Sequence, residues 1–475
     1  MNTPCMGLLD VLDERLGDGL ERAVLAHHRR RLGKLGWASV LGGDAGSWSP
    51  HRRVRDGNLV RVLIDGREGL PEIDAAIRAA RSHVHIANWH ASADFRLTRE
   101  PGSPPLRDLL ADVAERVDVR MLVWGGPPVP LFEPTRKRTR RSTAEFERDS
   151  RVRCLLDTRE RTLHCHHEKI VVVDDEVAFV GGLDFTALDG DRHDTTDHPP
   201  REPVGWHDLA ARIEGPAVAD VAEHFRQRWQ EIAREELPEP RVPAAKGGAS
   251  VQIARTVPER TYDFAPRGDF SLADAYLRGL RSAERLVYLE NQFLWSPEVV
   301  EILIDKLRTP PDPRFRVVLV LPRKPSNGAD TTRGQLGRLL DADDGNGRLV
   351  AATLAAHDGS PVYVHAKLAI VDDRWLTLGS ANLNEHSLFN DTEVNLVTDD
   401  PDLARDTRLR LWAEHLGLAE SEVDGPPDEV VDRLWRAALD HDAGRAGEHR
   451  AVRLPGVSRR SERLQGPLRG LLVDG

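Results

Sequence analysis

Short apolar runs alternate with amphipathic stretches through two long regions of the chain. Runs with the length and composition of strands lie at residues 59–64, 83–87, 119–124, 251–253, 286–289 and 315–321. Stretches with apolar positions at helical spacing separate them, at residues 71–81, 106–116, 272–283 and 297–307. Strands that alternate with helices indicate helical layers on a sheet, so we expect two similar α/β sandwich lobes in one chain.

The two regions also share a unit made of a strand, a turn and a second strand. In the first copy, residues 170–173 are apolar, Asp174 and Asp175 form the turn, and residues 177–180 are apolar again. The second copy has the same order at residues 368–371, 372–373 and 375–378. Each copy is predicted to be a buried β-hairpin.

Each hairpin carries the same motif, which is a histidine, a lysine, an aspartate and a glycine at fixed spacing. Every member recurs at an offset of 198 positions, and the pairs are His167 and His365, Lys169 and Lys367, Asp174 and Asp372, and Gly181 and Gly379. One such motif is weak evidence, but two in register within the same strand context are hard to obtain by chance. We therefore expect one active site, built from both lobes at their interface.

The histidine and lysine of each motif suit the chemistry of a phosphodiester. Because strand side chains alternate between faces, residues two positions apart point the same way. A phosphodiester repels nucleophiles and its leaving alkoxide needs a proton, so the site must neutralise charge, attack phosphorus and donate a proton. One neutral imidazole can attack while the other, protonated, acts as general acid and later as base. The two lysines would stabilise the non-bridging oxygens, and the site then needs no metal and no other cofactor.

The paired motifs resemble those of the phospholipase D superfamily, whose members cleave phosphodiesters through a covalent phosphohistidine. The resemblance covers roughly residues 55 to 420 and is most specific in the two motifs. Weaker matches narrow it towards the phospholipase D enzymes proper, at residues 86–89, 182–186, 192–194, 206–208, 213–218, 288–293 and 414–417.

The resemblance implies roles for the histidines and for two acids. His167 is expected to be the nucleophile and His365 the general acid. Glu393 occupies the position of the acid that orients the second histidine, and Asp208 is the best equivalent in the first half. Such a partner fixes the tautomer of the ring, as in a serine protease triad.

Further motif residues are expected to support the site. Asn382 can donate its amide to a phosphate oxygen, whereas its counterpart Asp184 is an acceptor when ionised, so the two halves differ there. We group Asp174 and Asp372 with the catalytic residues of the motif, although their position after a strand favours a turn-capping role. The glycines Gly181 and Gly379 complete the supporting set.

Length and composition fit a two-lobed protein. The 475 residues exceed the usual size of one domain. We expect a helical extension (1–50), a first lobe (51–236), a linker (237–250), a second lobe (251–420) and a C-terminal extension (421–475). The 77 acidic residues exceed the 66 lysines and arginines by 11, and no run reaches the roughly 20 apolar residues of a membrane span. The N-terminus lacks the pattern of a secretory signal, so a cytoplasmic monomer is expected.

The cysteines and their neighbours suggest two further kinds of site. Cys5, Cys154 and Cys165 cannot all pair and lack metal-ligand spacing, so no disulfide framework is expected. A catalytic role for Cys165 is an alternative that the histidine and lysine pairs make unnecessary. The run from His164 to His167 would suit zinc, but the second copy has no such cluster, so we expect no metal.

A basic run at residues 136–141 is the main charge anomaly. It is either a solvated loop or a contact with anionic lipid head groups, where each basic side chain adds about 1 kcal/mol near a charged surface. Nucleic acid would use the same charges. Aromatic residues make up only 5% of the chain and none lies in the run, which argues against base stacking there.

The expected function is therefore that of a phospholipase D-like phosphodiesterase. It would hydrolyse a glycerophospholipid to phosphatidate and an alcohol, with transphosphatidylation wherever an alcohol outcompetes water. Peripheral contact with a membrane is expected, and nucleic acid is not the expected substrate. Three alternatives stay open: a cardiolipin-synthase-type phosphatidyltransferase, a nuclease or other non-lipid phosphodiesterase, and a lipid-binding module without activity.

Overall fold

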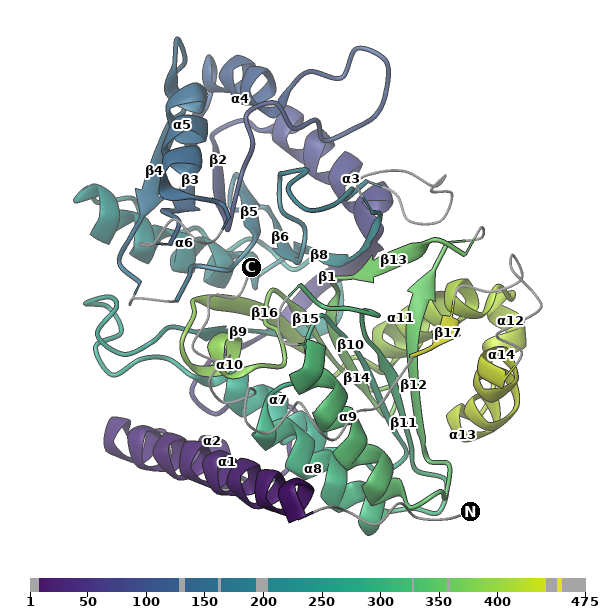
Figure 1. Ribbon diagram of the computed structural model, residues 1–475. Coiled ribbons are helices and arrows are strands. Elements are labelled where there is room, and N and C mark those ends of the chain that lie inside the picture. Colours follow the sequence, from purple (N-terminus) through teal and green to yellow (C-terminus); the bar gives the residue numbers. More distant parts are fainter. Residues whose placement is uncertain are drawn as a thin grey trace.

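The chain folds into two halves that repeat one order of strands and helices (Figure 1). The computed structural model describes residues 8–127, 133–160, 164–193, 204–326, 329–356, 359–440 and 451–454. The elements of the first half are β1 (Val54–Ile64), α3 (Asp65–Ala79), β2 (His83–Asn88), α4 (Leu106–Ala114), β3 (Asp118–Trp124), α5 (Arg136–Glu147), β4 (Arg153–Asp157), β5 (Ile170–Val173), β6 (Val177–Gly181), β7 (Trp206–His207), β8 (Leu209–Glu214) and α6 (Val218–Ala233).

The second half follows the same plan. Its elements are β9 (Ala249–Thr256), α7 (Ser271–Ser282), β10 (Leu286–Asn291), α8 (Pro297–Arg308), β11 (Arg316–Val320), α9 (Ala329–Asp343), β12 (Leu349–Ala355), β13 (Pro361–Val364), β14 (Lys367–Val371), β15 (Trp375–Gly379), α10 (Glu385–Phe389), β16 (Glu393–Thr398) and α11 (Pro401–Leu416). The flanking elements are α1 (Leu8–Leu35), α2 (Ser39–Gly42), α12 (Glu420–Val423), α13 (Pro427–Val430), the π-helical turn η1 (Val431–Trp435), α14 (Arg436–Asp440) and β17 (Ala451–Arg453).

Seven strands of each half form a mixed sheet, and these two sheets match strand for strand. The first has the order β4-β3-β2-β5-β6-β8-β1. The second has the order β12-β11-β10-β14-β15-β16-β9. β1 also pairs antiparallel with β9, so the two sheets are joined edge to edge. Both predicted hairpins are confirmed, as β5 with β6 and β14 with β15.

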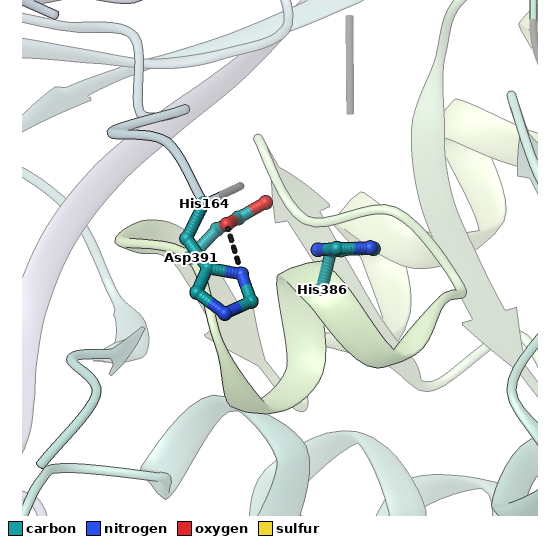
Figure 2. A group of neighbouring side chains, drawn as sticks. All are labelled: His164, His386 and Asp391. Carbon is teal, nitrogen blue, oxygen red and sulfur yellow. Dashed lines mark ion pairs between the residues drawn. The ribbon is translucent and has the colours of Figure 1, made fainter. Parts of the chain in front are cut away.

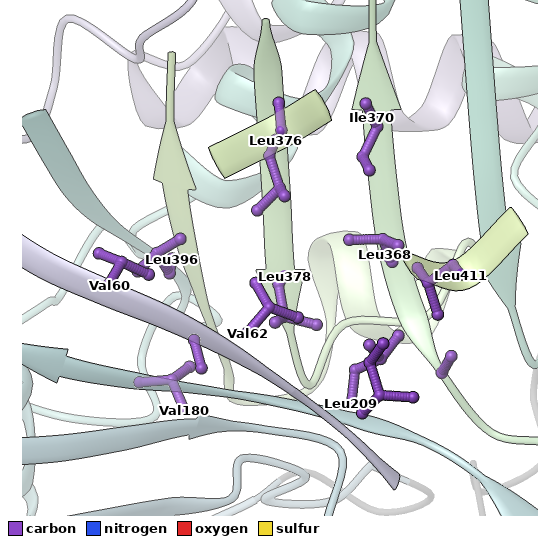
Figure 3. Close-up of a cluster of buried hydrophobic side chains, with 14 of the residues drawn as sticks. Val60, Val62, Val180, Leu209, Leu368, Ile370, Leu376, Leu378, Leu396 and Leu411 are labelled. Atoms are coloured by element: carbon purple, nitrogen blue, oxygen red, sulfur yellow. The ribbon is translucent and has the colours of Figure 1, made fainter. Parts of the chain in front are cut away.

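The largest core lies where the two sheets face each other (Figure 3). Val62, Val180 and Leu209 of the first sheet approach Leu368 and Leu378 of the second. Helices α6 and α11 close this core, which both sheets share. The two halves therefore bury one continuous apolar interior.

Helices on the outer faces explain why the strands are apolar along their whole length. In β14, the alternate residues Leu368 and Ile370 enter the shared core, while Ala369 and Val371 pack under α7 and α8. The first sheet is covered in the same way by α3 and α4. Burial on both faces favours continuous apolar strands over alternating ones.

The N-terminal segment packs on the second half. Leu32 of α1 and Val40 of α2 enter the core beneath α7 and α8. Residues 42–49, a segment rich in glycine and serine, are also held in place, because Ser49 is buried and its hydroxyl donates to Asp274 at 2.7 Å. In the part of the chain that the structure describes, no helix is long and apolar enough to cross a membrane.

Most predicted elements are confirmed, with two differences. The helix expected at 71–81 begins earlier, at Asp65, and so contains Pro71. The basic run is the start of helix α5, and the predicted loop is wrong. Thr135 caps this helix by accepting the backbone N–H of Arg138 at 3.3 Å, and its buried residues Thr139 and Phe146 hold it against the first half.

Candidate active site

Each motif histidine lies just before a central strand and is held by the opposite half of the chain. His167 precedes β5, and its backbone N–H donates to the carbonyl oxygen of Thr392 at 3.0 Å. His365 precedes β14, and its N–H donates to the carbonyl oxygen of His207 at 2.8 Å. The second contact continues the parallel pairing of β7 with β13. The segment that leads into each motif therefore crosses to the other half.

The acid partner of each histidine also comes from the opposite half. Nδ1 of His167 lies 3.0 Å from Oε1 of Glu393, and Nδ1 of His365 lies 2.6 Å from Oδ2 of Asp208. The sequence-based assignment gave Glu393 to His365 and Asp208 to His167, and this pairing is wrong. The reason is the crossing of the segments, since the residues that hold the histidine backbones directly precede these two acids in the chain.

The surroundings of the rings decide their tautomers. Nδ1 of His167 lies 3.1 Å from the carbonyl oxygen of Ser380, which can only accept, so Nδ1 carries the proton and Nε2 the lone pair. Burial raises the pKa of Asp208 to about 6, so Asp208 is ionised at pH 7 and accepts the Nδ1 proton of His365. Burial raises the pKa of Glu393 to about 8.

Burial, together with the charges of Lys367 and Lys169, lowers the pKa of His365 well below its usual value. His365 is therefore neutral at pH 7 in the absence of substrate. An anionic phosphate between the two lysines would offset their charge and raise this pKa again.

The glycines of the motif allow the close approach of neighbouring strands. A Cβ atom on Gly181 would lie 2.5 Å from the carbonyl oxygen of Leu209, and one on Gly379 would lie 2.3 Å from that of Val394. The next residue differs between the halves for a related reason. The short side chain of Asp208 keeps its carboxylate close to its own backbone and next to Gly182. A Cβ on Gly182 would therefore lie 2.0 Å from that carboxylate. The longer Glu393 leaves room for Ser380, whose hydroxyl donates to its carboxylate.

The two lysines lie beside their histidines in different surroundings. Nζ of Lys169 donates to the carbonyl oxygen of His167 at 2.6 Å and lies 3.4 Å from the carboxylate of Asp184. It also lies 5.9 Å from the centre of the Trp89 ring. Nζ of Lys367 donates to the carbonyl oxygen of His365. Both ammonium groups are thus fixed next to the imidazoles.

Gln292 is a site residue to which the sequence analysis gave no role. Its amide oxygen accepts from Asn382 at 3.3 Å and lies 3.5 Å from Nζ of Lys367. Its counterpart in the first half is Trp89, since each follows the asparagine that ends a corresponding strand, Asn88 in β2 and Asn291 in β10. Both residues belong to segments that carry the family resemblance, but only the fold brings them to the lysines.

Both histidines open onto one pocket of about 640 Å³ between the halves. Trp89, Trp206 and Tyr363 give it aromatic walls, and Arg192 stacks on Trp206 at 3.9 Å. Two exposed cations, Arg323 and Lys324, also line it. The pocket therefore combines aromatic walls with many charged and polar side chains, which suits a ligand that has both apolar and anionic parts.

Comparison with known proteins agrees with this geometry. A family model described as "Phospholipase D" matches residues 76–202 and 194–299, and one described as "Cardiolipin synthase, PLD-like domain" matches residues 276–412. The two matches follow one another along the chain and cover both motifs. The chain belongs to the phospholipase D superfamily.

Curated relatives in this superfamily include plant enzymes. Phospholipase D alpha 3 of Arabidopsis thaliana is 25% identical over an alignment that covers 78% of this chain and 65% of the relative. Phospholipase D alpha 1 of Cynara cardunculus is 25% identical over an alignment that covers 82% of this chain and 70% of the relative. The chain thus spans about two thirds of the length of these relatives.

A solved structure shows the same fold. Phosphatidylserine synthase from Haemophilus influenzae Rd KW20 matches with a TM-score of 0.52 and 13% identity, over 80% of this chain and 93% of that protein. The predicted fold class, two similar phospholipase D-like α/β lobes in one chain, is confirmed.

The aspartates of the superfamily motif lie at the far ends of the strands, away from the histidines. The Asp174 carboxylate accepts the backbone N–H groups of Arg81, Ser82 and His83 at 2.7 to 2.9 Å. Asp372 accepts three N–H groups of residues 284–286 in the same way, at 2.7 to 2.8 Å. Their grouping with the catalytic residues is wrong, because a strand of about five residues, roughly 16 Å, separates each from its lysine. Both cap the turn that starts a neighbouring strand.

Neither of the two cysteines that the structure describes, Cys154 and Cys165, supplies a reacting group to this site. Cys165 packs with Trp89 and Trp124, and its thiol lies 3.4 Å from the carboxylate of Asp391. Cys154 is buried, which raises the pKa of its thiol to about 12. Cys5 lies outside the described residues.

Proposed function

We propose that this protein is a phospholipase D-type phosphodiesterase that hydrolyses glycerophospholipids to phosphatidate and a free alcohol. The observation that carries the proposal is the pair of imidazoles from the two halves, each with an acid on Nδ1 and both at one pocket. With Nδ1 engaged, the reacting nitrogen of each ring is Nε2.

The reaction takes two displacements at phosphorus. Nε2 of His167 attacks, a P–N bond forms, and the bond to the head-group oxygen breaks as His365 gives that oxygen a proton. In the second step, His365 takes a proton from water, the hydroxide attacks phosphorus, and the P–N bond breaks to release phosphatidate. A neutral His365 can take a proton from water, as the second step requires. In the first step, the negative charge of the substrate raises the pKa of His365, so that the ring is protonated and can act as the acid.

The remaining residues neutralise charge and position the phosphate. Lys169 and Lys367 stabilise the non-bridging oxygens, where negative charge grows in the transition state. Asn382, held by Gln292, is placed to donate beside Lys367. Asp184, which pairs with Lys169, sets the orientation of that ammonium group.

A lipid substrate is supported by the pocket and by the relatives. Aromatic walls suit the glycerol region of a lipid, and a pocket of about 640 Å³ is of the size that takes one small-molecule head group. Phosphatidyl transfer is the second candidate, because the match to a cardiolipin synthase domain covers the second motif and the phosphohistidine can pass its phosphatidyl group to any alcohol.

The test is incubation with phosphatidylcholine, with and without ethanol, and in parallel with single-stranded and duplex DNA. We expect choline and phosphatidate without ethanol, and phosphatidylethanol with it, and neither product from the His167→Ala protein. Cleavage of DNA without turnover of lipid would replace this proposal by a nuclease.

The covalent step can be examined separately by acid quenching during turnover of a slow substrate. A phosphoryl adduct is expected on the peptide that contains His167. An adduct on His365 would reverse the two roles, and no adduct under single-turnover conditions would favour direct attack by water.

A further inference from the structure

A group of potential metal ligands lies beside the active site and takes no part in the proposed reaction (Figure 2). His164 precedes the first motif, His386 is in α10, and Asp391 follows α10 in the second half. One ligand atom from each residue lies within 4.8 Å of the other two. His386 and Asp391 are fully buried or nearly so, and His164 is partly exposed.

His386 is the residue that most needs an explanation. Its side chain has no exposed surface, and neither ring nitrogen has a hydrogen-bond partner among the residues that the structure describes. Buried polar groups are almost always paired, because leaving one unpaired loses its interaction with water without replacement. Figure 2 shows the ring of His386 on α10, to the right of the pair formed by His164 and Asp391.

The distance between the other two members fits shared coordination better than a hydrogen bond. Nδ1 of His164 lies 3.6 Å from Oδ1 of Asp391, which is too long for a hydrogen bond. Two ligands of one tetrahedral zinc ion, each about 2.0 to 2.1 Å from the metal, lie about 3.4 Å apart. His164 and Asp391 are already close to that spacing, and the ligand atom of His386 starts within 4.8 Å of both.

We propose that His164, His386 and Asp391 bind one divalent transition-metal ion of the zinc class. Two imidazoles and one carboxylate suit such ions and disfavour calcium and magnesium, which prefer oxygen ligands. Asp391 is already oriented for the role, because Oδ1 accepts the backbone N–H of Cys165 at 2.9 Å. The exposed part of His164 gives the ion a route from solvent.

A second group of buried histidines shows the contrast. His207 and His415 lie 2.7 and 2.8 Å from the two carboxylate oxygens of Glu290. Those distances are hydrogen bonds, and they are too short for neighbouring ligands of one tetrahedral ion. Each histidine of that group makes a hydrogen bond and only Nδ1 of His415 has no partner among the described residues, whereas both ring nitrogens of His386 have none.

The ion would fasten the two halves together next to the active site. Backbone pairing joins the same segments, since Thr392 N–H donates to the carbonyl oxygen of Cys165 at 3.1 Å and His167 N–H donates to that of Thr392. Asp391 and Glu393 flank Thr392 in the sequence, so the metal would secure this junction through Asp391, while Glu393 secures it through His167. Its expected effect is on stability, independent of the proposed hydrolysis.

The test uses the full chain without an affinity tag, stripped with a chelator and dialysed against zinc chloride. We expect one zinc ion per chain, and at least tenfold weaker binding in His164→Gln and in His386→Gln. His51→Gln is the matched control, since His51 is exposed, contacts the Trp37 ring and belongs to no group of potential metal ligands among the described residues, and this variant should bind zinc as the wild type does. No zinc bound by the wild type, or equal binding in all variants, would overturn the proposal.

A spectroscopic measurement on the wild type covers the case in which the His386 variant does not fold. The zinc-edge X-ray absorption spectrum should show nitrogen and oxygen ligands at about 2.0 to 2.2 Å, including imidazole, and a sulfur ligand at about 2.3 Å would overturn this ligand set. Saturating zinc should also raise the unfolding midpoint of the stripped wild type, by about 2 to 3 °C at a hundredfold excess over Kd. The His164→Gln protein should show a rise of at most about half this size at the same zinc concentration, because binding at least tenfold weaker leaves at most a tenfold excess over its Kd.

Discussion

The substitution Asp208→Asn tests whether Asp208, the acid that the first half supplies to His365, controls the tautomer of that histidine. The shape of the side chain is kept, and only the charge and one acceptor are lost. Oδ1 of Asp208 accepts the backbone N–H of Leu209 at 2.8 Å, while Oδ2 faces Nδ1 of His365 at 2.6 Å. In the variant, the amide oxygen must stay on Leu209, so the NH₂ group faces His365. Nδ1 then has to accept, and the ring proton moves to Nε2.

The size of the effect follows from the two ways in which the variant can respond. Keeping the productive tautomer loses a charge-assisted hydrogen bond, about 1.5 to 3 kcal/mol, and leaves a buried donor unpaired, about 1 to 3 kcal/mol. Together these penalties are about 2.5 to 6 kcal/mol, which corresponds to a loss of about 10² to 10⁴ in rate. The alternative tautomer has no lone pair on Nε2 with which to activate water.

The assay is the turnover of a soluble short-chain phosphodiester, which separates chemistry from membrane binding. The wild-type rate should fall as the pH drops below about 6, because Asp208, whose pKa burial raises to about 6, then becomes neutral. The variant should lack that step. Asp372→Asn is the matched control, because Asp372 belongs to the motif of His365 but only caps a turn. This variant should have lower stability and an unchanged kcat. An Asp208→Asn protein within tenfold of the wild type would refute the role given to this acid.

Three further predictions concern the histidines, metals and membranes. His167→Ala and His365→Ala should each abolish turnover and leave the fold intact, because attack on phosphorus and protonation of the leaving group are separate tasks. Circular dichroism checks the fold, and activity within tenfold of the wild type in either variant would contradict the two-histidine mechanism. Excess EDTA should leave the initial rate below the unfolding temperature nearly unchanged at fixed ionic strength, whereas a loss that zinc or calcium restores would show that the reaction depends on a metal. Exposed charges of α5 can be reversed by Lys137→Glu, Arg140→Glu and Arg141→Glu. This change should weaken hydrolysis of anionic vesicles and leave hydrolysis of a soluble substrate unchanged. Added salt should have the same effect on the wild type, since the Debye length is only about 10 Å at 0.1 M. Equal losses on both substrates would place the helix at the catalytic site.

The sequence predicted the reacting groups because they are local. A histidine and a lysine two positions apart on a strand share a face whatever surrounds them, and repetition at a constant offset indicated two halves of one site. The hairpins were predictable for the same reason, since a strand, a turn and a strand are adjacent in the chain. The capping role of the motif aspartates was also visible in their position after a strand.

The partners of the reacting groups could not be predicted from local patterns. Glu393 was correctly selected as a candidate but given to the wrong histidine, because the crossing of the segments depends on pairing between residues 226 positions apart. Gln292 and Trp89 lie in segments with a recognisable pattern, yet their contact with the lysines depends on how β2 and β10 pack beside the motif strands. The basic run gave no sign of being helical from its charges alone, and two buried residues and a threonine cap decided that.

The sequence by itself therefore determined the groups on which the proposed reaction rests, two histidines and two lysines on two repeated hairpins, because strand geometry fixes which side chains within a few residues face together. Only the tertiary structure decided which acid serves which histidine, and it also brought His164 to His386 and Asp391. Those contacts join residues that are remote in the chain. They exist because the two sheets bury one shared core and so place the segments of one half against those of the other.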